Sequence, residues 1–181
     1  MGKVQKDMAE TVLVTGGSGF VAGWCIVRLL EAGHTVRATL RDLGKAEAVR
    51  QAVAAVVDPG QRLSFVKADL TLDDGWDDAV AGCDRVLHVA SPLGFDGSDD
   101  LEALTRPARD GTLRVLAAAK RADVKRVVIT SSCAAATPRD TTRDGLTDET
   151  VWTDPQDPNL NAYRKSKAIA ERAAWDWAHA H

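Results

Sequence analysis

The chain has 181 residues, of which 45% are hydrophobic and 27% charged, a balance typical of one soluble globular domain and too apolar for a disordered chain. It carries 23 Lys and Arg against 26 Asp and Glu, so its formal net charge is −3. This mildly acidic balance argues against nucleic acid as a partner, because phosphate backbones favour clustered cations.

Three cysteines are present, Cys25, Cys83 and Cys133. Their odd number and wide separation fit neither a disulfide framework nor a zinc site, so we expect reduced thiols, no metal and a cytoplasmic protein. Cys133 is expected to be a small buried thiol. The N-terminus lacks the apolar core of a secretory signal, and the most apolar run, 52–57, is too short to span a bilayer, so no membrane association is expected.

Short β-branched runs alternate with helical patterns along the whole chain. The strands are expected at 11–15, 35–40, 63–68, 85–90 and 126–132. The helices are expected at 19–32, 45–57, 73–81, 99–120 and 161–180. Gly33 is expected to stop the first helix, and Pro107 to split or kink the fourth.

This alternation predicts an α/β fold with a doubly wound parallel sheet, of the Rossmann type, and helices on both faces. Residues 1–10 are expected to form a tail, and 11–181 a single dinucleotide-binding domain. The polar stretch 134–160 is long for a connection within a domain, so we expect it to be a functional lid or a binding loop.

The motif TGGSGFVA, at 15–22, directly follows the first strand and opens the first helix. Glycine at 16 permits a tight turn, glycine at 19 lets the backbone approach a pyrophosphate, and alanine is an accepted third residue. The helix N-terminus then offers N–H groups to phosphates. The predicted phosphate site comprises Gly16, Gly19, Phe20 and Val21, and the alternative is a tight turn without a ligand.

The end of the second strand indicates which dinucleotide binds. NAD sites usually carry Asp or Glu there, whereas this chain has Arg41, and its carboxylate comes only afterwards, at Asp42. A guanidinium can clamp a 2′-phosphate, so NADPH is predicted over NADH. Lys45 is expected to assist and Arg37 is a nearby reserve; the alternative is that these are solvated surface cations.

Tyr163 is the only tyrosine, and Lys167 lies four residues later, on the same face of a helix. A nearby ammonium favours the phenolate, which suits Tyr163 to exchange a proton with a substrate oxygen. Ser132 ends the fifth strand, where ligands of doubly wound sheets bind, and can hydrogen-bond the same oxygen. The alternative is a surface helix contact. His88, inside an apolar strand, is expected to be a satisfied core histidine.

Five motifs together resemble those of the extended short-chain dehydrogenase/reductases, and in particular the branch of dihydroflavonol-reductase-like and related aldehyde or ketone reductases. They are TGGSGFVA, KADL at 67–70, HVASP at 88–92, ITSS at 129–132 and NAYRKSKAIAERAAW at 161–175. The resemblance covers almost the whole chain. It implies NADPH-dependent reduction of an aldehyde or ketone, with a small carbonyl compound as substrate.

The resemblance also assigns roles to individual residues. Tyr163 would be the proton donor, Lys167 would hold the nicotinamide ribose and lower the pKa of the tyrosine, and Ser132 would polarise the carbonyl. Arg41 would contact the 2′-phosphate. The other cofactor contacts that it implies are Asp69 and Leu70 at the adenine, and Ala90, Ser91 and Pro92 beyond the fourth strand.

Two departures favour a reductase over the sugar-modifying enzymes that the resemblance also covers. Sugar-modifying members often show Val-Tyr-Gly after the strand-five serines, where this chain has Cys-Ala-Ala at 133–135. They often carry Asn three residues before a Gly-Thr pair on the fourth helix, where this chain has Ala108. An NAD(P)-dependent sugar epimerase or dehydratase and a non-catalytic dinucleotide-binding module stay open as alternatives.

The sequence provides five strands, whereas a complete sheet of this type has six. Relatives continue with a sixth strand and a smaller C-terminal region that builds most of the substrate pocket. The chain therefore resembles an N-terminal portion. We expect the isolated chain to keep the cofactor site, to reduce carbonyls poorly and to self-associate through uncovered apolar surface.

Overall fold

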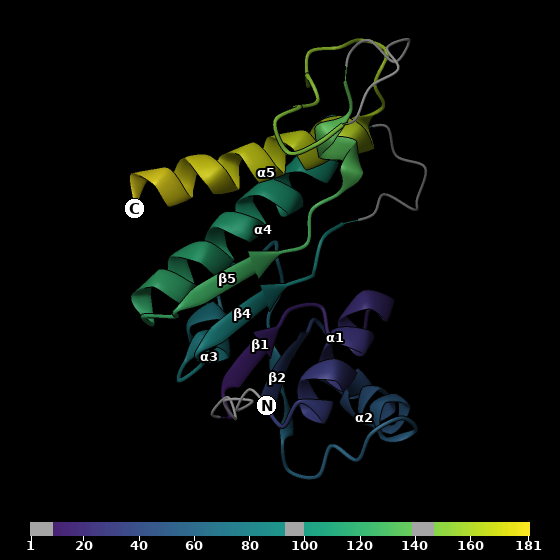
Figure 1. Cartoon of the computed structure of the whole chain (residues 1–181), viewed down its shortest axis with the longest axis vertical. Helices are drawn as coiled ribbons and strands as arrows, with labels where there is room; N and C mark the ends of the chain where they lie inside the picture. The colour runs from purple at the N-terminus through teal and green to yellow at the C-terminus, as the bar shows by residue number, and fades with distance from the viewer. Residues whose placement is uncertain (1–8, 93–99, 139–146) are drawn as a thin grey trace, which may run out of the picture.

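A computed structural model describes residues 9–92, 100–138 and 147–181. Five parallel strands form one sheet in the order β3-β2-β1-β4-β5, so the doubly wound α/β prediction is confirmed (Figure 1). The strands are β1 (Thr11–Val14), β2 (Thr35–Leu40), β3 (Leu63–Lys67), β4 (Arg85–His88) and β5 (Arg126–Ile129).

Most strands end earlier than the sequence pattern indicates, by one to three residues. The difference is largest at β5, which was expected to reach residue 132. Its last bond to the sheet is the one that the N–H of Thr130 donates to the carbonyl of His88 at 2.9 Å. Ser131 and Ser132 therefore lie beyond the strand, where the chain turns into the 3₁₀-helix η2 (Cys133–Ala136).

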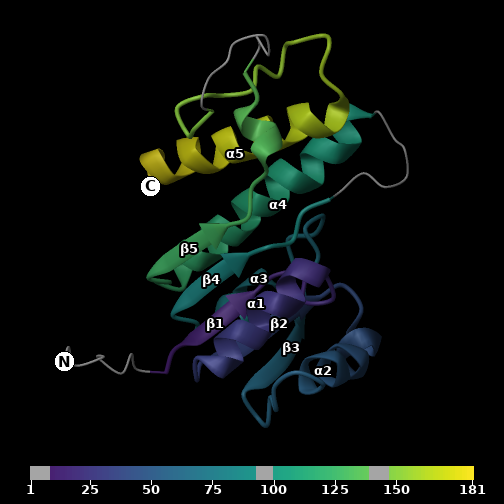
Figure 2. The same cartoon turned by 45° about the vertical axis from the view of Figure 1, so that its right-hand side comes forward.

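The helices cover both faces of the sheet (Figures 1 and 2). One face carries α1 (Phe20–Glu31) and α2 (Ala46–Ala54), the latter preceded by the 3₁₀-helix η1 (Leu43–Lys45). The other carries α3 (Trp76–Val80) and α4 (Leu101–Arg121), and α5 (Ala162–Ala180) packs along α4. Among the helices of the described ranges, none is long and apolar enough to cross a membrane.

Adjacent residues of β1 build the two cores, because successive strand side chains point to opposite faces. Leu13 packs with Trp76 and Val115 below α3 and α4, and Val14 packs with Ile26 below α1. Leu13 and Val14 are both fully buried. A central strand buried on both faces explains the continuous apolar run that identified it in the sequence.

Two helix predictions have different outcomes. Gly33 follows α1 with φ +90°, a left-handed conformation that favours glycine, so the predicted stop is confirmed. The predicted split at Pro107 is wrong, because α4 runs through it as one helix. Proline lacks an N–H, so the carbonyl of Ala103, one turn earlier, loses its usual helical donor there.

Two further expectations differ from the structure. Cys133, expected to be buried, is exposed because it starts the short helix η2 at the surface. Glu10, assigned to the N-terminal tail, packs on the sheet: its carboxylate pairs with Arg85 and its carbonyl accepts from Thr35 at 2.9 Å.

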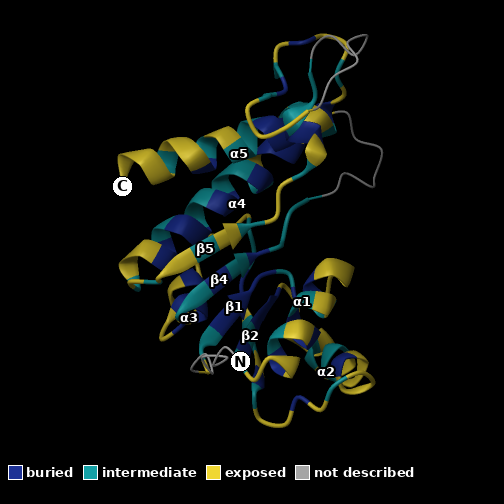
Figure 3. Cartoon of the chain, viewed as in Figure 1, coloured by how far each residue is buried: buried dark blue, intermediate teal, exposed yellow. Residues whose placement is uncertain are grey.

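The outer side of β5 is poorly covered (Figure 3). Arg126 and Val128 of this strand are exposed, and Val128 keeps 51% of its surface accessible. The C-terminal half of α5 is also largely exposed, with Trp175 at 53%. Exposed apolar side chains thus remain on β5 and α5, the last strand and the last helix of the described residues.

Candidate functional site

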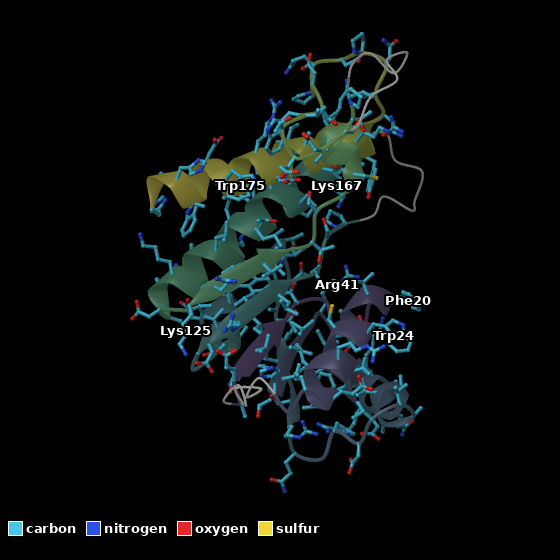
Figure 4. All side chains as sticks on the ribbon, viewed as in Figure 1. Phe20, Trp24, Arg41, Lys125, Lys167 and Trp175 are labelled. Atoms are coloured by element: carbon cyan, nitrogen blue, oxygen red, sulfur yellow. The ribbon has the colours of Figure 1, made fainter. Side chains whose placement is uncertain are left out.

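A groove of about 840 Å³ runs along the carboxyl ends of the strands. The predicted site residues that line it are Gly16, Gly19, Phe20, Val21, Arg41, Asp69, Leu70, Ala90, Ser91, Pro92, Tyr163 and Lys167. In Figure 4, Phe20, Arg41 and Lys167 lie on the side of the sheet where the strands end, whereas Lys125 lies on the opposite side. One concave surface thus gathers side chains from almost the whole length of the chain.

The glycine turn forms one wall of this groove. Gly16 has φ +72°, and a Cβ there would lie 3.0 Å from the Cβ of Ala90. Gly17 donates to the carbonyl of Thr39 at 2.8 Å, and a Cβ on it would lie 2.8 Å from the Cβ of Ala38. The turn is therefore pressed against the ends of β2 and β4, and side chains would force it away.

Helix α1 begins directly after this turn with its N-terminus open to the groove. Its N-cap, Gly19, provides no side-chain acceptor, and its first turn contains no acidic residue. The first helical residues, Phe20, Val21 and Ala22, line the groove. Their N–H groups and the positive end of the helix dipole suit a pyrophosphate, so the turn fits the phosphates of a dinucleotide.

Of the three charged residues considered after β2, Arg41 lines the groove, whereas Asp42 and Lys45 do not. The carboxylate of Asp42 instead accepts from the N–H of Gly44 at 2.9 Å and so caps η1. Lys45 is exposed at the end of η1 and is not among the lining residues.

Arg37 is not a reserve for phosphate binding, so this expectation is wrong. Its guanidinium donates to the carbonyls of Asp78 at 3.1 Å, Ala79 at 3.0 Å and Ala81 at 2.7 Å. These are orphan carbonyls at the C-terminal end of α3. The side chain therefore points to the α3 face of the sheet, where it caps that helix.

The residues that follow β3, Asp69 and Leu70, form one end of the groove. The carboxylate of Asp69 accepts from the N–H and the hydroxyl of Thr71, at 2.9 and 2.8 Å, and these donors lower its pKa. Helix α4 approaches closely at Gly111, where a Cβ would lie 2.7 Å from the Cβ of Leu70. The two predicted adenine contacts are thus fixed in place, Asp69 by hydrogen bonds from Thr71 and Leu70 by close packing against Gly111 of α4.

Tyr163 and Lys167 lie at the other end, on the first turns of α5. Asn161 caps this helix by accepting from the N–H of Arg164 at 3.0 Å. The ammonium of Lys167 lies 5.1 Å from the centre of the Tyr163 ring. Lys167 is only 7% exposed, and burial lowers its pKa to about 8.

The two strand-end serines have different partners. Ser132 caps η2 by accepting from the N–H of Ala134 at 3.2 Å, and it is not among the lining residues of the groove. Ser131 does line the groove, and its hydroxyl donates to the carboxylate of Glu171. The structure therefore brings Ser131, and neither Ser132 nor Lys45, into the surface that holds Tyr163 and Lys167.

Sequence reasoning also missed Thr39, Glu171 and the α4 wall at Ala103, Leu104 and Pro107. Glu171 had a usable signal, because it follows Lys167 by the same four residues that separate Lys167 from Tyr163. The stretch 134–160 was expected to be a lid or a binding loop, but none of its described residues lines the groove. Residues 139–146 of this stretch lie outside the described residues.

His88 is the satisfied core histidine that the sequence predicts. The hydroxyl of Thr15 accepts from the N–H groups of the two residues after His88, at 3.0 and 2.9 Å, and so donates to its Nδ1 at 2.8 Å. Thr112 donates to the carbonyl of Ala108 at 2.8 Å and so accepts from Nε2 at 3.1 Å. The ring is therefore neutral, and burial lowers its pKa to about 4, with a further contribution from Lys167.

No group of three or more His, Cys, Asp or Glu side chains suited to a metal ion occurs within 9–92, 100–138 and 147–181. The main chemical groups of the described site are the open N-terminus of α1, the Arg41 guanidinium, the Asp69 carboxylate, the Tyr163 phenol and the buried Lys167 ammonium.

Comparison with known proteins gives consistent matches. The NAD dependent epimerase/dehydratase family matches residues 12–181. The chain is 39% identical over 175 residues to a dihydroflavonol 4-reductase of Hordeum vulgare, covering 92% of this chain and 48% of that protein. It is 42% identical over 175 residues to cinnamoyl-CoA reductase 1 of Petunia hybrida, covering 93% and 50%.

A solved reductase structure also matches this chain. The yeast methylglyoxal/isovaleraldehyde reductase complexed with NADPH superimposes with a TM-score of 0.82 at 30% identity, over 94% of this chain and 53% of that one. The chain spans about half the length of the relatives that it matches.

Proposed function

Since the chain belongs to the NAD dependent epimerase/dehydratase family, we propose that it provides the cofactor site and the proton-transfer groups of an NADPH-dependent aldehyde or ketone reductase. The observation that carries this proposal is the composition of one groove. It has an open helix N-terminus and Arg41 along one part and the Tyr163–Lys167 pair at another. The relatives and the solved structure compared above are reductases, which agrees with this proposal.

The residues present fit a dinucleotide. Gly16, Gly19 and the first N–H groups of α1 would hold the pyrophosphate, and Asp69 and Leu70 would contact the adenine. Arg41 would pair with a 2′-phosphate, and the carboxylate of Asp42, which follows it, is engaged by the N–H of Gly44, so NADPH is preferred over NADH. When bound, NADPH supplies the hydride that adds to the carbonyl carbon.

The chain's own residues handle the proton. Tyr163 would donate its phenolic proton to the carbonyl oxygen as the carbon–oxygen double bond becomes an alcohol, and the phenolate would regain a proton from solvent. The Lys167 ammonium would hold the nicotinamide ribose and favour the phenolate. Ser132 is proposed to polarise the carbonyl, although in this structure its hydroxyl caps η2.

The whole activity is assigned to a protein longer than this chain, because the chain spans about half of its relatives. The same observation favours a second candidate for the isolated 181 residues, namely a dinucleotide-binding module with little or no turnover. A small carbonyl compound as substrate and a cytoplasmic location belong to the proposal for the whole protein.

A panel of aldehydes and ketones tests the proposal with NADPH and NADH, on this chain and on a full-length form. Oxidation of NADPH that depends on the carbonyl compound, with release of NADP⁺, is expected for the full-length form. A cofactor that stays bound and oxidised while a nucleotide sugar is epimerised or dehydrated would overturn the reductase in favour of the sugar-modifying alternative. Binding without turnover in the full-length protein would favour the non-catalytic module.

A further inference from the structure

Three side chains form a stripe along one face of α5. Tyr163, Lys167 and Glu171 follow each other at intervals of four residues, which places them one above the other on a helix. The first two belong to the proposed reaction. The third has no role in it, although Glu171 borders a small cavity next to the groove together with Lys167.

The stripe is joined to the ends of two neighbouring strands. Lys167 donates to the hydroxyl of Ser91 and the carbonyl of Pro92, which follow β4. Glu171, one turn further along, accepts from the hydroxyl of Ser131, which follows β5. These two contacts, one turn apart, tie the helix that carries Tyr163 to the edge of the sheet where the cofactor groove lies.

The position of the Glu171 carboxylate needs an explanation. Among the described residues that line the groove and the small cavity, the acidic side chains are Asp69 and Glu171. A half-buried carboxylate loses part of its hydration and needs a local hydrogen-bond donor in exchange. Its partner here is the Ser131 hydroxyl, and a hydrogen bond to a charged acceptor is stronger than one between neutral groups.

The Lys167 contacts and the Ser131–Glu171 hydrogen bond, here called the tie, respond differently when cofactor binds. Under the proposed function, on which this inference rests, Lys167 turns to the nicotinamide ribose and gives up contacts with Ser91 and Pro92. Ser131 lines the groove, but neither it nor Glu171 is assigned to the phosphates, the adenine or the ribose, so their hydrogen bond is expected to persist. This hydrogen bond also fixes Ser131, the residue before Ser132. Because successive side chains of an extended chain point in opposite directions, holding Ser131 also sets the direction of Ser132.

We therefore infer that Glu171 is a positioning residue, which holds the start of α5 in place over the groove through Ser131 while Lys167 serves the cofactor. Ser131 is exposed and Glu171 half-buried in this chain, so their hydrogen bond adds a small but measurable share of the folding free energy and chiefly fixes the placement of Tyr163. A small displacement of such a group lowers the efficiency of a reaction strongly.

The single tyrosine makes this inference measurable on the 181-residue chain. With ¹³Cζ-labelled tyrosine, one NMR signal reports Tyr163, and saturating NADP⁺ is expected to shift it in the parent. In Glu171→Ala and in Ser131→Ala, this shift is expected to fall to less than half. Glu171→Gln keeps an acceptor oxygen and is expected to restore it. Asp176→Asn, an exposed carboxylate on the same helix, is the matched control and should respond as the parent does.

The affinity for NADPH is measured in parallel and is expected to stay within about threefold in all four variants, since the tie does not touch the phosphate or adenine residues. A full Tyr163 shift in Glu171→Ala would overturn the inference. If that variant fails to fold by circular dichroism, Ser131→Ala, which removes one hydroxyl, decides the question by the same criterion.

A second measurement separates this inference from the proposed function. Without cofactor, the double variant Ser131→Ala/Glu171→Ala should lower Tm no more than the larger single effect, because both changes remove one shared bond. Additive losses would refute the tie. A parent chain that binds no NADP(H) would refute the proposed function and leave this thermal test to decide the tie alone.

Discussion

The ammonium of Lys167 donates a hydrogen bond to the hydroxyl of Ser91 at 2.5 Å and another to the carbonyl of Pro92 at 3.1 Å. Both acceptors are neutral, and the side chain is only 7% exposed. A buried charge that is held by neutral partners costs folding free energy, which is why burial lowers its pKa to about 8. Groups kept at such a cost are typical of functional sites.

Replacing this ammonium should therefore stabilise the protein and impair its function. We expect Lys167→Met to raise the free energy of unfolding at pH 7 by roughly 1 kcal/mol, a figure discounted for solvent screening, and to weaken NADPH binding and turnover. Thermal unfolding and NADPH fluorescence measure the two effects. Lys165→Met, on the same helix, is the control and should change neither. A less stable variant with unchanged affinity would contradict the assigned role.

Arg41 should determine the choice of cofactor. Arg41→Ala is expected to weaken NADPH binding by about 1.5–3 kcal/mol, the contribution of a hydrogen bond to a charged group, and to leave NADH binding nearly unchanged. Fluorescence titrations with both cofactors give the preference. Lys45→Ala is the comparison, since Lys45 does not line the groove, and it should keep the preference. Equal affinities of the parent for the two cofactors would remove the basis of this assignment.

Tyr163→Phe should separate binding from chemistry, because it removes the proposed proton donor and almost no volume. In the full-length protein, we expect turnover to fall by about 10²–10⁴-fold, as is usual for general acid–base groups, while NADPH affinity is kept. Steady-state rates and cofactor titrations provide the comparison. A variant within a few-fold of the parent rate would show that another group donates the proton.

His88 should make stability depend on pH. Its pKa is about 4 in the folded protein, against an ordinary value of 6.5, so the unfolded chain binds protons more readily. The stabilisation is therefore complete above pH 6.5 and is lost as pH falls toward 4, by roughly 3 kcal/mol in all.

The test is urea unfolding between about pH 7 and 5, where carboxyl groups such as Asp69 and Asp84, with ordinary pKa values of 3.8, still keep their contributions. His88→Gln should abolish most of the pH dependence in this range, and His179→Gln, at an exposed site, should preserve it. A parent whose stability is flat across the range would contradict a neutral, buried His88.

The uncovered side of β5 should make the isolated chain associate. An edge strand with an exposed apolar side chain can pair with another copy, and Val128 is such a residue, 51% exposed. We expect sizing to show oligomers that Val128→Lys reduces. Val56→Lys is the matched control, since Val56 is 52% exposed but lies after α2. A parent that runs as a stable monomer with ordinary reductase turnover would refute the expected dependence on a further region.

Local patterns were sufficient for the fold and for much of the groove. The β1–β2 order, the glycine turn and the spacing of Tyr163 and Lys167 involve neighbours in sequence, and each depends on backbone geometry that a few residues specify. Gly16 and Gly33 were recognisable for this reason, since both adopt left-handed conformations that glycine favours.

Tertiary structure alone decided where equivalent side chains go. Arg37 and Arg41 are both cations of the same segment, yet Arg37 caps α3 and Arg41 faces the groove. Ser131 and Ser132 are adjacent, yet one bonds to Glu171 and the other caps η2. Arg41 lies just past the end of β2, and both serines lie past the end of β5, so which member of each pair reaches the site depends on where the strand ends and on what packs beside it. Those contacts come from segments some 40 residues away, and no local pattern encodes them.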